Sequence, residues 1–118
     1  MLIYVGKLTY SPYASDELIT VVFRDNVQNG DKVVVMLQWT KDSGGKAKAN
    51  FSNHGTVNNM VVNGSGDKQL EIFSAPAEKE ANYYWFKGKV SGQNLTLTMS
   101  NKSGEEVAKD IQLKLFYF

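Results

Sequence analysis

Residues 94–99 read Asn-Leu-Thr-Leu-Thr-Met, and apolar and polar side chains alternate at every position. Successive side chains of a β-strand point to opposite faces, so this stretch predicts a strand with one apolar and one polar face. Its apolar side chains then face a core and its polar ones face solvent. The inward set is Leu95, Leu97 and Met99, and the outward set is Asn94, Thr96 and Thr98.

The same period of two recurs in both directions from this stretch, with turn sequences rich in Gly, Asn and Ser between the periodic segments. Only residues 74–81 have helical composition, and Pro76 limits them to a short helix. Residues 33–40 are apolar on both faces and predict a central strand covered on both sides. The polar stretch 52–59 predicts a loop. The expected strands are 2–10, 18–24, 33–40, 46–51, 60–62, 69–73, 82–90, 94–99 and 111–118.

About eight or nine short strands with turns between them are typical of an all-β domain. We expect a single antiparallel β-sandwich, jelly-roll or Ig-like, over residues 1–118, with a small β-barrel as the alternative. The length of 118 residues suits one domain.

The charge balance argues against a nucleic-acid partner. The chain carries 13 Lys and Arg against 12 Asp and Glu, a formal net charge of +1, and Arg24 is its only arginine. Proteins that bind a phosphate backbone usually carry a clear basic excess with arginine well represented. We therefore expect no nucleic-acid ligand.

The chain contains no cysteine, which excludes disulfides, thiolate zinc sites and a cysteine nucleophile. No stretch approaches the roughly 18 apolar residues of a membrane helix. Residues 1–10 lack the basic and continuous apolar regions of a signal peptide. These features predict a cytoplasmic location or secretion without a visible leader.

Catalytic residue patterns are missing as well. The one histidine, His54, follows Ser52 by two residues, but no Gly-x-Ser-x-Gly nucleophile turn occurs in the sequence. The acidic pairs occur in polar stretches, where solvated surface charge is their ordinary role. These pairs are Asp16 with Glu17, Glu78 with Glu80, and Glu105 with Glu106. The sequence therefore predicts that the protein is not an enzyme.

Oxygen ligands are the only metal chemistry that this composition leaves open. Asp25, Asn26 and Asp31 in one expected loop, or Asn63 and Asp67 in another, suit calcium. The same residue types also form Asx-turns, which need no ion. We expect no cofactor, with calcium as the alternative.

Four Asn-x-Ser/Thr sequons suit glycosylation, although turns rich in Asn beside strands rich in Thr create such sequons without any glycan. Their asparagines are Asn50, Asn63, Asn94 and Asn101.

The aromatic run Tyr83–Phe86 is the most informative positive feature. Tyr83 and Trp85 must share one face of a strand, and Tyr84 and Phe86 the other. One pair can fill the core while the other lies outside it. Flat indole and phenol rings beside amide and carboxylate groups suit sugar rings, which stack on them and hydrogen-bond through hydroxyls.

The sequence therefore predicts a non-catalytic, lectin-like module whose partner is a carbohydrate or glycoconjugate. Two alternatives remain open: a membrane-binding, cytolysin-like protein with aromatic anchors, and a structural subunit that assembles with copies of itself through an aromatic face. The expected ligand-binding residues are Trp85, Tyr83, Trp39, Asp42, Asn53, His54, Asn58 and Asn59.

Overall fold

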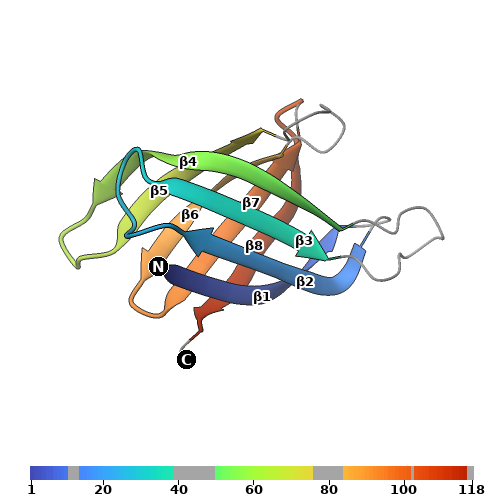
Figure 1. Cartoon of the computed structure of the whole chain (residues 1–118), viewed down its shortest axis with the longest axis horizontal. Helices are drawn as coiled ribbons and strands as arrows, with labels where there is room; N and C mark the ends of the chain where they lie inside the picture. Colours follow the sequence, from blue (N-terminus) through green and yellow to red (C-terminus); the bar gives the residue numbers. More distant parts are fainter. Residues whose placement is uncertain (11–13, 39–49, 76–83, 102, 117–118) are drawn as a thin grey trace.

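The chain forms eight antiparallel strands that close into a barrel (Figure 1). This computed structural model describes residues 1–10, 14–38, 50–75, 84–101 and 103–116, without the side chains of residues 50, 51, 53 and 73–75. Those residues include no helix. The strands are β1 (Leu2–Tyr10), β2 (Ala14–Phe23), β3 (Lys32–Gln38), β4 (Asn50–Val62), β5 (Lys68–Ala75), β6 (Tyr84–Ser91), β7 (Asn94–Asn101) and β8 (Glu106–Leu115).

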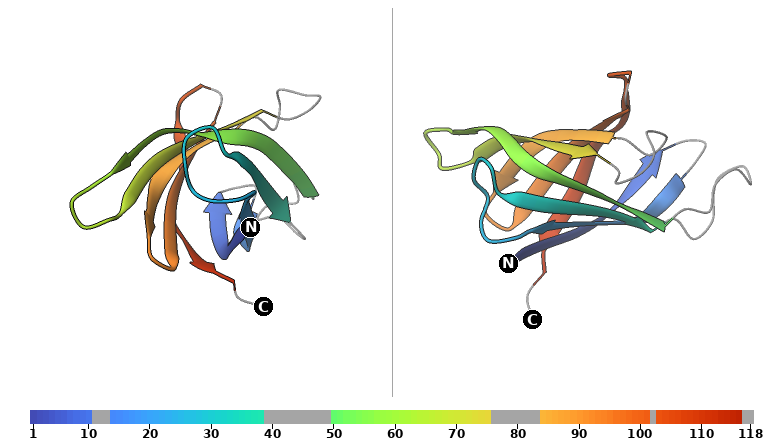
Figure 2. Two further views of the ribbon diagram at one scale, coloured as in Figure 1. Left: turned by 60° about the vertical axis from the view of Figure 1, so that its left-hand side comes forward. Right: turned by 45° about the horizontal axis from the view of Figure 1, so that its top comes forward.

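Each strand pairs with the next along the chain, and β1 pairs with β8 to close the sheet. Tyr4 lies opposite Leu115 and Gly6 opposite Leu113 at this seam. The views in Figure 2 show the strands wrapping around one interior. The expected β-sandwich is therefore wrong, and the alternative of a small barrel is confirmed.

Two glycines stand where an added side chain would meet the backbone of the neighbouring strand. A Cβ atom on Gly88 of β6 would collide with the carbonyl oxygen of Thr96 in β7. A Cβ on Gly6 of β1 would collide with the carbonyl oxygen of Gln112 in β8. Glycine at such points lets a strand bend sharply, and this bending allows a single sheet to curl into a barrel.

The inward side chains of all eight strands fill the interior. Leu95, Leu97 and Met99 are fully buried, as the alternation in residues 94–99 predicts. Tyr4 packs edge-on against Phe23, with ring centroids 5.9 Å apart. The other large, fully buried side chains are Phe86, Ile19, Leu37, Ile72, Leu113, Val21 and Val27.

A barrel has only one interior, so each strand can bury only one face. Val33, Val35 and Leu37 of β3 are buried, whereas Val34 and Met36 on the outer face are half-buried. The prediction that this strand is covered on both sides is therefore wrong.

Residues 24–31 close the barrel at the end where β2 finishes. Val27 in this loop is buried, and Lys68 Nζ donates to its carbonyl oxygen at 3.1 Å. Asp31 Oδ2 accepts the backbone N–H groups of Asp25 and Asn26, at 3.3 and 3.0 Å. Asp31 thus organises the loop through N–H groups five and six residues before it, which differs from the Asx-turn that these residue types also allow.

Several strands run farther than the sequence predicts, most clearly β4, β2 and β8, which begins at Glu106 and not at residue 111. Residues 52–59, expected as a loop, belong to the long strand β4, which pairs with β3 and β5. Strand β2 begins at Ala14, so Glu17 falls on the inward face with Ile19 and is 7% exposed. Glu17 is therefore buried, not the solvated surface charge expected from its polar neighbours.

The turns at 63–67 and 101–105 share one sequence pattern, Asn-x-Ser-Gly-acid, and one geometry. In each, the Asn Oδ1 accepts the backbone N–H groups two and four residues later, at 3.0–3.1 Å. The glycine has a positive φ, 89° at Gly66 and 86° at Gly104. The amides of Asn63 and Asn101, both in sequons, thus serve as turn caps.

Candidate functional site

Strand β6 presents an aromatic side chain to each side of the barrel wall. Phe86 is 1% exposed and Tyr84 is also buried, so both belong to the core. Trp85 lies between them in sequence and is 46% exposed. The alternation of strand side chains thus places one indole on the outer surface.

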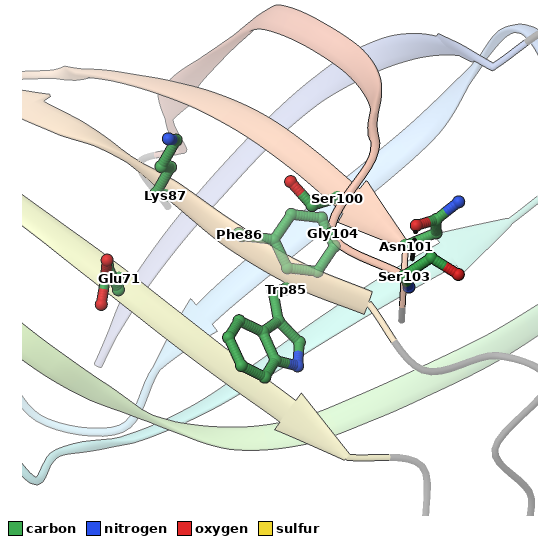
Figure 3. Close-up of a pocket in the computed structure, with 8 residues that line it drawn as sticks. All are labelled: Glu71, Trp85, Phe86, Lys87, Ser100, Asn101, Ser103 and Gly104. Carbon is green, nitrogen blue, oxygen red and sulfur yellow. Dashed lines mark hydrogen bonds between the residues drawn. The ribbon is translucent and has the colours of Figure 1, made fainter.

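A pocket of about 360 Å³ lies beside this indole. Trp85 lies opposite Ser100 of β7 in the sheet register. In Figure 3 the indole projects toward β5, whereas Ser100, Asn101 and Ser103 line the pocket from β7 and the turn after it. Glu71 and Lys87 complete the polar part of the lining. The pocket therefore combines one flat apolar ring with hydroxyl, amide and charged groups.

A second hollow of about 590 Å³ lies next to the first, farther along β6. Glu71 and Lys87 line both hollows, so the two adjoin in one region of the outer face. We call it the β6 groove. Its further lining comes from Asn59, Gln69, Leu70, Gly88, Lys89, Thr96, Thr98 and Asp110.

Short side chains on β7 account for the hollow between β6 and β8. The outward positions of β7 carry Thr96, Thr98 and Ser100, all half-buried. These residues lie opposite Lys89, Lys87 and Trp85, which are larger. A row of three hydroxyl groups therefore runs along one side of the β6 groove.

Asn59 forms part of the opposite side. It lies at an irregularity in the β4–β5 pairing, with φ of 51°, and such a bulge re-aims a side chain. Asn59 Nδ2 donates to Glu71 Oε2 at 2.6 Å. This bond fixes the orientation of a carboxylate that lines both parts of the groove.

The charges around the groove are balanced. Among its lining residues, Lys87 and Lys89 carry the positive charges, and Glu71 and Asp110 the negative ones. Lys87 Nζ lies 3.6 Å from Glu106 Oε2, and Lys89 Nζ lies 3.7 Å from Asp67 Oδ2. The groove therefore presents polar groups without an excess of positive charge.

The structure brings two of the expected ligand-binding residues to this groove, Trp85 and Asn59. Asn58 is half-buried, and its Nδ2 donates to the Thr56 carbonyl at 3.0 Å, within its own strand. Asn53 lies in β4 opposite Val35, with its side chain outside the described part. Three expected residues lie outside the described residues altogether: Tyr83, Trp39 and Asp42.

His54 lies on the exposed face of β4. Its Nε2 is 3.5 Å from Ser52 Oγ, as residues two apart on one strand face allow. Among the described residues, no Asp or Glu is hydrogen-bonded or ion-paired to His54. Within that part of the chain, the pair has no orienting acid of the kind that a nucleophile–base arrangement requires.

Most of the residues that line the groove were not predicted from the sequence as ligand-binding residues. They are polar residues in regular strands, without an unusual pattern of their own. Alternation identifies Lys87 and Lys89 as sharing the face of Trp85, which is the one signal that could have found them. Their neighbours across β5, β7 and β8 require the sheet register, which the sequence does not display.

Comparison with protein-family models, curated proteins and solved structures finds no match. Within the described part of the chain, no group of three or more His, Cys, Asp or Glu residues could hold a metal ion. The same part contains no helix long and apolar enough to cross a membrane.

Proposed function

We propose that this protein is a non-catalytic carbohydrate-binding module and that Trp85 is the stacking platform of its site. The exposed indole beside a pocket of hydroxyl and amide groups carries this proposal. Sugar rings stack their C–H faces on aromatic rings and hydrogen-bond through their hydroxyls, and this pocket offers both kinds of contact.

The placement of the platform also supports recognition. Trp85 lies in a strand that is paired on both sides, with β5 and with β7. A platform on a rigid sheet loses little conformational freedom when it binds a ligand. The site therefore needs no large rearrangement to bind a sugar.

The two exposed aromatic rings of the described residues, Trp85 and Phe116, do not lie together. Trp85 begins β6, whereas Phe116 follows the end of β8, which runs in the same direction as β6. The two exposed rings of the described residues thus lie at opposite ends of the barrel. Trp85 and Phe116 therefore cannot anchor at one depth together, and a membrane-facing surface would have to use Phe116 with the exposed apolar side chains at its own end, Met1, Val61 and Val62.

Binding to an array of neutral and acidic glycans tests this function. We expect the wild-type chain to bind at least one neutral glycan and Trp85→Ala to lose at least about tenfold in affinity, as for truncation of a central Trp. Phe116→Ala is the matched control, because it removes an exposed ring at the other end of the barrel.

No binding to any glycan at high protein concentration contradicts the proposal, and so does unchanged affinity in Trp85→Ala. Light scattering of the same samples tests the assembly alternative. A dimer that Trp85→Ala dissociates would show that the indole is a subunit contact instead.

A further inference from the structure

We propose that the ligand is a linear, neutral oligosaccharide that lies along β6, with one sugar on Trp85 and the following sugars in the rest of the β6 groove. This inference rests on the proposed function and specifies the class of its ligand. Its basis is that the two hollows adjoin along β6 and share Glu71 and Lys87 in their linings.

The length of the groove argues for more than one sugar. From Trp85 to Lys89 the lining follows four residue steps along β6. At about 3.4 Å per residue this is about 14 Å, longer than one pyranose ring. A monosaccharide on Trp85 leaves the part beside Lys89 empty, whereas a linear oligosaccharide in line with the strand fills both.

The hydrogen-bonding groups repeat along the same direction. Thr96, Thr98 and Ser100 occupy alternate positions of β7 and form one hydroxyl row. Amide and carboxylate groups of Asn59, Gln69 and Glu71 lie on the other side of β6, from β4 and β5. A linear oligosaccharide carries hydroxyl groups along both of its edges. These hydroxyls can hydrogen-bond to the β7 row on one side and to the amide and carboxylate groups on the other.

The balanced charge argues for a neutral ligand. The two lysines of the lining are matched by Glu71 and Asp110, and each lysine lies near a further acid, Glu106 or Asp67. An anionic chain would meet the carboxylates of Glu71 and Asp110 in the lining itself. Like charges close together are unfavourable, so uronic or sulfated sugars should bind less well than neutral ones.

A chain-length series measured by calorimetry tests the inference. The probes are the mono- to hexasaccharides of the neutral glycan that binds best on the array. We expect the affinity to rise at least about tenfold from mono- to trisaccharide and to level off in longer chains, because the groove is then full. Equal affinity for the monosaccharide and the longer chains overturns the inference.

A pair of matched variants locates the additional sugars. Thr98→Val removes one hydroxyl from the groove and keeps the β-branched shape. It should weaken the trisaccharide several-fold and leave the monosaccharide unchanged. Thr20→Val makes the same change on the outer face of β2, away from the groove, and should alter neither affinity. An unchanged trisaccharide affinity in Thr98→Val contradicts the placement.

The outcomes separate the two proposals. Trp85-dependent binding without any gain from chain length leaves the proposed function standing and removes this inference. Tighter binding of an acidic oligosaccharide than of a neutral one of equal length contradicts only the claim that the ligand is neutral. Absence of glycan binding removes both.

Discussion

Phe86 and Trp85 are neighbours in sequence with opposite environments, 1% and 46% exposed. Phe86→Ala should reduce the free energy of unfolding by about 3–5 kcal/mol, because it opens a cavity in the barrel interior. Trp85→Ala should cost about 1 kcal/mol, since its ring lies partly in solvent. Urea unfolding of both variants measures this difference. Equal, large losses would show that both rings are core residues and would remove Trp85 from the candidate site.

Gly88 is a second residue that is important for the structure, because it has no side chain. Gly88→Ala should destabilise the protein by about 1–3 kcal/mol, because its Cβ would collide with the Thr96 carbonyl oxygen and push β6 away from β7. Gly64→Ala is the control, because a Cβ there meets only open space. Thermal unfolding compares the two. A Gly88→Ala protein as stable as Gly64→Ala would contradict the close approach.

At the scale of elements, the Asn-x-Ser-Gly-acid turns set the registers of β4 with β5 and of β7 with β8. Gly66→Ala and Gly104→Ala should each cost about 1–2 kcal/mol, because a side chain is strained at positive φ. Chemical unfolding measures both, and again Gly64→Ala, in the same turn as Gly66, is the control. A loss at only one of the two positions would show that the turns are not equivalent.

At the scale of the whole molecule, the seam between β1 and β8 distinguishes a barrel from a sandwich. In a strand with a neighbour on each side, every backbone amide is hydrogen-bonded and should exchange its hydrogen slowly. In an edge strand, only alternate amides are hydrogen-bonded in this way. We therefore expect slow hydrogen exchange at consecutive amides in residues 4–6 and 113–115, comparable with that in β2. Exchange resolved to single amides by NMR measures it. Fast exchange at alternate positions would show two free edges and an open sheet.

The sequence predicts the local structure well where one side-chain pattern is sufficient. The alternation in residues 94–99 matches the observed burial in β7, and the turns at 63–67 and around 101–104 occur where Asn and Gly predict them. The prediction from sequence fails where a strand is polar on both faces. Residues 52–59 look like a loop because their own side chains show no apolar alternation, and pairing with β3 and β5 is what makes them a strand.

The candidate site divides in the same way. Alternation alone predicts that Trp85 and Phe86 point to opposite faces of the strand and that Trp85 and Lys87 share a face. It does not predict which of the two faces packs against the core. That choice depends on how the eight strands close, because closure gives the sheet one interior and one exterior. Asn59, Thr98 and Asp110 line the groove only because the folded sheet places β4, β5, β7 and β8 near β6.

The sequence by itself thus determined an all-β chain, most of its strands, its turns and a strand with aromatic residues on both faces, since these follow from residue type and the period of two. The tertiary structure alone decided that the sheet is a closed barrel and that Trp85 lies on its outer surface. The physical reason is that closure depends on the pairing of β1 with β8 and on the close backbone approach of Gly6 to Gln112, and both involve residues far apart in the chain.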